Sequence, residues 1–361
     1  MSTTTTEQTP APATEQAPAK QPSRLWNALD ERLGLNSLQY PIPEHANRLA
    51  YSLGGLSFVC FLLLLATGIF LTQYYHADPL AAHESVHEII TSVTLGGFIR
   101  AFHYWTAMTM VVLVGLHLLR VFVAGSYKRP REGNWIIGVI LAGATAMFFF
   151  TGTVMKWDQE SFEALQHNVA LGKLMGGLGF WFSPNFGGIP LLHRLYSLHV
   201  TLLPSAFAFL VLVHLLLVKR HGMAPSPFRK GPLPEPTAKF SRHLSHLLAF
   251  SLVLVGLVTL LALLVPPGHG PAPVAGIEVT KPAWPLLWIY PVENWVGISG
   301  ILWATVAMFT ALLIVPFVDR GEERNPRRRL KIVIPAAILA IGVISLIIYA
   351  AVQPVASHIG G

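Results

Sequence analysis

Long uncharged apolar stretches dominate the hydrophobic pattern of the chain. Seven of them are long enough to cross a bilayer, since a helix needs about 20 apolar residues to span the hydrocarbon core. None of the seven contains Asp, Glu, Lys or Arg. The pattern predicts transmembrane helices at 49–72, 101–119, 135–155, 195–218, 247–267, 295–318 and 332–352. The expected fold class is therefore an all-α membrane protein with seven transmembrane helices.

The composition agrees with this pattern. Only 12% of the residues are charged, about half the share found in soluble domains, and 53% are hydrophobic. The single cysteine, Cys60, lies in an apolar run, so this chain can form neither an internal disulfide nor a cysteine-based metal site. These features favour an integral membrane protein over a soluble or disulfide-stabilised one.

The basic residues are distributed unevenly between the two sets of loops. A net charge of +7 would also suit nucleic acid or anionic lipid. However, all but five of the 25 Lys and Arg residues flank the same ends of the spans; the five on the other side are Arg100, Lys156, Lys173, Arg194 and Lys281. Lys and Arg favour the cytoplasmic side. We therefore expect a cytoplasmic N terminus, a C terminus on the outer side, and no nucleic-acid partner.

Four of the 15 histidines lie inside the predicted spans. His103 and His117 are on the second span, and His199 and His214 are on the fourth, which runs in the same direction. His103 and His199 therefore share the outer depth, and His117 and His214 share the inner depth. Spacings of 14 and 15 residues keep each pair on one broad helix face, roughly 21–23 Å apart along the axis. Two facing helices thus offer two bis-histidine sites, and histidine commonly holds haem iron.

Other interpretations of these histidines remain open. Ionisable residues are expensive in a membrane and usually mark function, but a lone histidine in a span is often only hydrogen-bonded at a helix interface. Zinc binding and proton relay are further alternatives. Zinc is disfavoured because each depth supplies only two ligands. The pairing in depth on two parallel helices favours haem over packing.

Glycines repeat with the same period as the histidines. Gly54 and Gly68 lie 14 apart on the first span, and Gly138 and Gly152 lie 14 apart on the third. Small residues at this period would leave room for one pair of flat ligands stacked across the bilayer. Close packing of helices through small residues is the alternative.

Basic residues near the ends of these spans are candidates for binding haem propionates. Arg100 and Arg120 are the first candidates, with Lys128 or Arg131 as additional ones. Guanidinium groups bind carboxylates through charge-assisted hydrogen bonds. The alternative is that these residues are ordinary charges flanking a span.

This arrangement resembles the cytochrome b/b6 family, the quinol-oxidising core of cytochrome bc and b6f complexes. The resemblance covers about 24–352, and the last three spans look like subunit IV of b6f complexes, here fused in one chain. The 15-residue spacing on the fourth span favours the b6-like branch. The motifs that carry the resemblance are YSLGGL at 51, IRAFHYW at 99, HLLRVF at 117, KRPREGNW at 128, TGTVMKWDQ at 151 and RLYSLHVTLLP at 194.

The resemblance implies a domain organisation. We expect an N-terminal four-helix di-haem bundle at 24–222, a linker at 223–242 and a three-helix subunit IV-like domain at 243–361. Residues 1–23, rich in Thr, Pro and Ala, are expected to form a disordered tail.

The resemblance also implies cofactors, partners and a location. The outer, low-potential b-type haem would lie between His103 and His199, and the inner, high-potential one between His117 and His214. Quinol would be oxidised near the outer face, sending one electron to a Rieske-type iron–sulfur protein and on to a cytochrome c. The other electron would cross both haems to reduce quinone near the inner face. The family further implies a homodimer in a prokaryotic cell membrane.

One departure from the family affects the outer quinone region. The family has Pro-Glu-Trp-Tyr between the fifth and sixth spans. At these positions this chain has Pro282, Ala283, Trp284 and Pro285. The first three would line the outer quinone region, but the glutamate expected to accept a proton from quinol is missing. Glu278 or Glu293 in the same segment could take that role.

Further departures affect cofactor number and the quinol pocket. Ser52 stands where b6-type proteins often have a cysteine that tethers an extra haem, so we expect two haems and no covalent one. Lys156 stands where proline is usual, and Tyr104 where arginine is common. Lys156, at the outer face, is expected to alter the quinol pocket or its partner contact.

Three functions remain open at this point. The first is the cytochrome b subunit of a quinol:cytochrome c oxidoreductase. The second is a di-haem, quinone-linked electron-transfer subunit without a bifurcating outer site, which the missing glutamate favours. The third is a haem-free transporter or scaffold, which is disfavoured because no pair of inverted repeats is evident.

Overall fold

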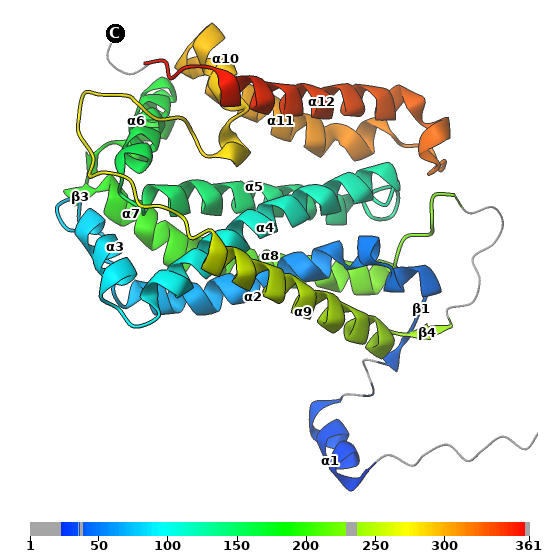
Figure 1. Cartoon of the computed structure of the whole chain (residues 1–361). Helices are drawn as coiled ribbons and strands as arrows, with labels where there is room; N and C mark the ends of the chain where they lie inside the picture. Colours follow the sequence, from blue (N-terminus) through cyan, green and yellow to red (C-terminus); the bar gives the residue numbers. More distant parts are fainter. Residues whose placement is uncertain (1–22, 35, 37–38, 229–236, 358–361) are drawn as a thin grey trace, which may run out of the picture.

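The structure, a computed structural model, describes residues 23–34, 36, 39–228 and 237–357 (Figure 1). Seven helices in these segments are long and apolar enough to cross a membrane, and each overlaps a predicted span. They are α2 (Leu49–Thr72), α4 (Gly96–Val123), α5 (Glu132–Val154), the continuous helix made of α7 (Leu191–Ser197), η4 (Leu198–Leu202) and α8 (Leu203–His221), α9 (Phe240–Leu264), α11 (Ile298–Val318) and α12 (Leu330–Val352). The predicted all-α membrane fold is confirmed.

Short elements occupy the connecting segments. They are α1 (Arg24–Leu33), β1 (Pro41–Ile42), η2 (Glu44–Asn47), α3 (Ala82–Thr91), α6 (Gln159–Leu174), η3 (Gly176–Phe182), β2 (Asn185–Phe186), β3 (Ile189–Pro190), β4 (Ala238–Lys239), η5 (Trp284–Leu286), α10 (Ile289–Val296) and η6 (Pro326–Arg328). Strand β1 pairs antiparallel with β4, and β2 pairs antiparallel with β3. The predicted disordered tail lies outside the described residues except for Ser23.

Helices α2, α4, α5 and α7–α8 form the central bundle, and the C-terminal helices flank it on two sides (Figure 1). Helix α9 packs on α2 and α4, where Leu254 and Val258 join the same apolar core as Cys60 and Phe102. Helix α11 packs on α5, and Val315 lies in a separate core cluster shared with the α4–α5 region. Burial of apolar side chains on both sides therefore fixes the bundle that carries the histidines.

The two ends of the bundle differ in their connections. The α6 end carries α3, α6 and α10, whereas the basic end carries the Lys- and Arg-rich connections 124–131 and 319–329. Helices α4 and α7–α8 both run from the α6 end to the basic end (Figure 1). This parallel direction is what places their histidines in matched pairs.

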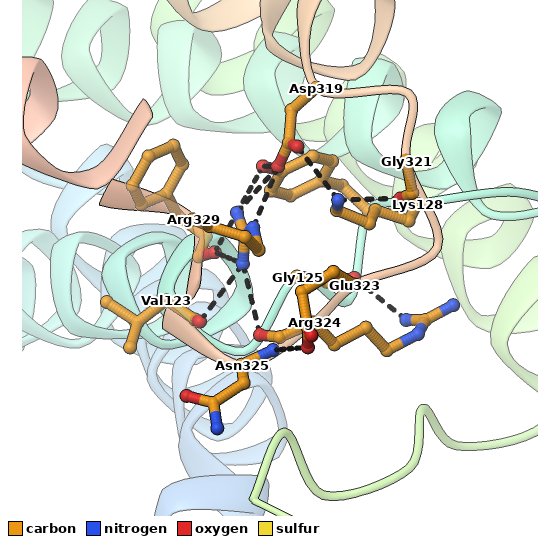
Figure 2. Close-up of polar contacts among 11 residues, drawn as sticks. Val123, Gly125, Lys128, Asp319, Gly321, Glu323, Arg324, Asn325 and Arg329 are labelled. Carbon is orange, nitrogen blue, oxygen red and sulfur yellow. Dashed lines mark hydrogen bonds and ion pairs between the residues drawn. The ribbon is translucent and has the colours of Figure 1, made fainter. Parts of the chain in front are cut away.

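A buried polar network closes the basic end (Figure 2). Asp319 forms ion pairs of 2.8 Å with both Lys128 and Arg329, and it accepts a hydrogen bond of 2.5 Å from the Tyr127 hydroxyl. Burial alone would raise the pKa of Asp319, but the bonds from Lys128 and Tyr127 and the nearby Arg329 charge lower it. The network thereby joins the α4–α5 connection to the α11–α12 connection.

Candidate functional site

The four predicted histidines form two pairs, one toward each end of the bundle. At the α6 end, His103 from α4 and His199 from η4 line one cavity of about 470 Å³, which we call the histidine cavity. Nearer the basic end, the rings of His117 from α4 and His214 from α8 are neighbours in a T-shaped arrangement. Their centroids are 6.4 Å apart and their planes meet at 75°. The structure therefore brings the histidines together in the pairs expected from topology.

Each predicted glycine lies against one of these histidines. A Cβ atom added at Gly54 would lie 2.9 Å from Cε1 of His117, so the imidazole approaches the α2 backbone closely. At the other three positions the nearest histidine Cε1 would be somewhat farther away. From the added Cβ atom to the histidine Cε1, the distance would be 3.5 Å for Gly68 and His103, 3.6 Å for Gly138 and His214, and 3.3 Å for Gly152 and His199. The glycines thus let α2 support the α4 histidines and α5 support those of α7–α8.

Threonine hydroxyls orient the two histidines at the α6 end. Thr67 Oγ1 lies 2.8 Å from the Leu63 carbonyl oxygen and 2.8 Å from His103 Nδ1. A hydroxyl has one proton, and if it donates that proton to the carbonyl it must accept from the imidazole Nδ1–H. Thr151 makes the same contacts to its own helix and to His199 Nδ1, at 2.8 and 2.7 Å. Both imidazoles then keep the lone pair on Nε2, as a metal ligand requires.

A π-helical turn carries His199. Residues Leu198–Leu202 form η4, the π-helical turn between α7 and α8. A π turn inserts one extra residue into an α-helix, and Pro204, in the first turn of α8, has no N–H to donate to an ordinary helical bond. The extra residue explains why the histidine spacing is 15 on this helix and 14 on α4, although both helices present matched pairs.

The dimensions of the basic-end pair fit a metal ion held between two imidazoles. Nitrogen–metal bonds of about 2.0–2.1 Å, as for zinc, place the ring centroids of two opposed imidazoles roughly 6 Å apart. The separation of 6.4 Å between His117 and His214 matches this requirement. Among the described residues, no group of three or more His, Cys, Asp or Glu could hold a bare ion. Two protein ligands suffice when a porphyrin fills the remaining positions, so the residues fit haem.

The predicted propionate-binding residues lie at opposite ends. Arg120 stacks 3.7 Å above the Tyr51 ring, and its Nη2 is buried without a hydrogen-bond partner among the described residues, which suits an anionic group. Arg100 lines the histidine cavity and donates to the carbonyls of Pro267 and Gly268, at 2.9 and 3.0 Å. Of the additional candidates, Lys128 lies in the Asp319 network and Arg131 donates to the His221 carbonyl at 2.8 Å.

The structure brings only part of the predicted quinone region to the histidine cavity. Ala283 lines the cavity, while Pro282 and Trp284 are its chain neighbours and Trp284 is exposed. Glu278 and Glu293 do not line it. Both carboxylates instead contact His167 Nε2 at 3.2 Å, and each is only 4% exposed.

Sequence reasoning missed the residues that contact the paired histidines. Thr67 and Thr151 each precede a candidate glycine, so a repeated Thr-Gly pair at Thr67–Gly68 and Thr151–Gly152 was an available signal. His167 carried no signal, because its carboxylate partners come from a segment more than 100 residues away in the chain.

Comparison with known proteins identifies the family. The family described as cytochrome b/b6/petB matches residues 37–222. The chain belongs to the cytochrome b/b6 family. It is thus a membrane protein of electron transport, and membership implies binding of b-type haem.

Two curated relatives cover the same region. Cytochrome b6 of Chlamydomonas reinhardtii is 36% identical over 212 residues, which is 56% of this chain and 98% of that protein. The menaquinol:cytochrome c reductase cytochrome b subunit of Geobacillus thermodenitrificans is 32% identical over 219 residues, with the same two coverages. The similarity to both therefore covers little more than half of this chain.

A solved structure extends the similarity of fold over nearly the whole chain. A chain from a hyperthermophilic respiratory Complex III is similar with a TM-score of 0.78 at 22% sequence identity, covering 91% of each chain. At this identity, the likeness supports the seven-helix fold alone.

Proposed function

We propose that this chain is the di-haem cytochrome b subunit of a quinol:cytochrome c oxidoreductase of the bc/b6f type. The observation that carries the proposal is the pairing of four histidines at two depths, each against a glycine of α2 or α5. One b-type haem would be held by His103 and His199 and the other by His117 and His214. When bound, the haems supply one-electron transfer across the membrane.

The chain's own residues would position these groups and control access to them. Thr67 and Thr151 orient the imidazoles at the α6 end, and Arg120 offers a buried cation to a propionate. Ala283 would adjoin quinol in the histidine cavity, next to Pro282 and Trp284. The apolar helices exclude water from the path between the pairs.

Orientation and partners are part of the proposal. The basic end would face the cytoplasm of a prokaryotic cell, because Lys and Arg concentrate there. Quinol oxidation would then occur at the outward-facing α6 end and quinone reduction near the basic end, with net proton translocation. A Rieske-type iron–sulfur protein and a cytochrome c would accept electrons, and the chain would assemble as a homodimer. The relationship to the Geobacillus menaquinol:cytochrome c reductase subunit supports cytochrome c as an acceptor.

The second candidate function is a di-haem, quinone-linked subunit that does not bifurcate electrons. The specific observation that favours it is Ala283, which stands where the family has its proton-accepting glutamate.

Quinol-dependent cytochrome c reduction by the purified complex separates the two candidates. Turnover that is blocked by inhibitors of the outer quinol site supports the reductase. Haems that quinol reduces without any sensitivity to these inhibitors would instead support the second candidate.

A further inference from the structure

At the α6 end, the ion pair between Lys156 and Glu160 lies between two cavities. Besides the histidine cavity, a second cavity of about 420 Å³ is lined by Gly268, Gly270 and Thr280 of the segment after α9; we call it the loop cavity. Tyr104, Lys156 and Glu160 line both cavities. A group in this position can exchange protons with either cavity.

Four other carboxylates at the α6 end have structural partners. Asp158 caps α6 by accepting from the backbone N–H and the hydroxyl of Ser161. Glu163 accepts from the backbone N–H groups of Val279 and Thr280, at 2.9 Å each. Glu278 and Glu293 both contact His167. Among the described residues, Glu160 is the carboxylate that lines the histidine cavity.

The surrounding structure holds Glu160 in place. Lys156 Nζ lies 2.5 Å from a Glu160 oxygen and 3.3 Å from Asp158. The intervening Trp157 adopts a left-handed backbone conformation with φ of 49°, and its indole donates to the Pro79 carbonyl at 2.9 Å. Positive φ is uncommon for residues other than glycine and is kept only where neighbours impose it. The turn thus brings Lys156 and Glu160, which are four residues apart in the chain, together at the cavity wall.

We propose that Glu160, positioned by Lys156, accepts a proton from quinol bound at the wall of the histidine cavity that these two residues line, beside the space that haem would fill, and so replaces the glutamate that is absent at Ala283. The proposal rests on the proposed quinol oxidation. In this step the quinol O–H bond breaks and an O–H bond forms on the Glu160 carboxylate. The second O–H proton leaves with one electron to the iron–sulfur protein, and the other electron leaves to the one-electron acceptor that His103 and His199 would hold, so that two protons and two electrons leave each quinol. The carboxyl group then releases its proton into the loop cavity.

The test compares Glu160→Gln with Glu84→Gln in the assembled complex. Glu84 is an exposed carboxylate on α3 at the same end, so it is a matched control. A general base contributes about 10²–10⁴-fold to a rate, so E160Q should lower kcat for quinol-dependent cytochrome c reduction about 100-fold or more, with little change in KM. E84Q should match the wild type. Infrared difference spectra with and without quinol should show a carboxylic-acid band that E160Q lacks.

The outcomes separate this proposal from the proposed function. An E160Q complex with both haems, unchanged turnover and an unchanged infrared band would overturn the role of Glu160 alone. A wild-type complex with both haems but no inhibitor-sensitive quinol oxidation would overturn the proposed function and this role with it. If E160Q does not retain haem, Glu160→Asp is measured instead. A displaced carboxylic-acid band then supports the assignment, and a band identical to the wild type overturns it.

Discussion

The two histidine pairs share one helix architecture but differ in what supports the imidazoles. At the α6 end, Thr67 and Thr151 hydroxyls bond the Nδ1 atoms of His103 and His199. At the basic end, the residues that precede the corresponding glycines are Leu53 and Ile137, which have no hydroxyl. An acceptor on Nδ1–H makes the imidazole a stronger electron donor to its metal. These hydroxyls therefore provide a physical basis for a lower potential at the α6 end than the same pair would have without them.

The two ends also differ in how far their charged side chains are enclosed by the protein. At the basic end, Asp319 is enclosed by Tyr127, Lys128 and Arg329, and its role is to join two connections (Figure 2). At the α6 end, Glu160 is 26% exposed and adjoins two cavities. The comparison teaches that the carboxylate at the α6 end adjoins open space, whereas the Asp319 network at the basic end joins two connections of the fold.

The largest expected difference between the two pairs comes from removing a single histidine, because one haem should be lost while the other stays. His117→Ala should abolish the basic-end haem while sparing much of the α6-end haem, because each pair is separate and supplies both protein ligands. His103→Ala should do the reverse. Haem stoichiometry and low-temperature optical spectra measure both variants. Two fully occupied, six-coordinate haems in either variant would contradict the ligand assignment.

The next largest effect is expected from adding a methyl group at Gly54. Its Cβ would lie 2.9 Å from His117 Cε1, whereas a Cβ at Gly138 would lie 3.6 Å from His214 Cε1, an ordinary contact. Overpacking typically costs about 1–3 kcal/mol, so Gly54→Ala should reduce or distort the basic-end haem while Gly138→Ala should be nearly neutral. The haem content of the two purified variants decides the point. Equal content in both would show that the close approach at Gly54 has no consequence for the site.

Removal of the threonine hydroxyl should produce a smaller, electronic effect. Thr67→Val removes the acceptor of His103 Nδ1–H, which weakens the imidazole as a donor and should raise the α6-end potential by on the order of tens of millivolts. The basic-end potential should not move, and Thr67→Ser should behave like the wild type. A redox titration measures both haems at once. An unchanged α6-end potential in Thr67→Val would remove the proposed basis for the difference between the pairs.

The smallest predicted effect concerns pH and is confined to the α6 end. Burial would lower the pKa of His167, but the bond and charge of Glu293, the bond to the Glu163 carbonyl and the charge of Glu278 raise it above its ordinary value of 6.5. The protonated form is therefore favoured in the folded protein. Its stabilising contribution is fully present below pH 6.5 and is lost as the pH rises through the raised pKa.

Hydrogen exchange in the segment that holds Glu278 tests this prediction. Protection should decrease as the pH rises above 6.5 and through the raised pKa of His167, after correction for the intrinsic exchange rate. His167→Gln should abolish most of that pH dependence. An identical pH profile in the variant would exclude His167 as its cause.

The sequence predicted the membrane spans, the fold class and the pairing of the four histidines at two depths. These could be predicted because the length of an apolar stretch and the periodicity of a helix are local properties. It did not predict the π turn at His199, since its spacing of 15 also fits one broad face of an ordinary helix. The contacts of His167 with Glu278 and Glu293 depend on how a long segment folds back on α6, which periodicity does not specify. The importance of Glu160 likewise arises only from the two cavities that meet beside it.

A reduced-minus-oxidised spectrum of the purified protein, with pyridine haemochrome quantitation and a redox titration, tests the central claim most directly. The two histidine pairs predict two b-type haems per chain with separate potentials and no covalently attached haem at Ser52. One haem per chain, or none, would contradict the paired sites and return the four histidines to helix packing or proton transfer.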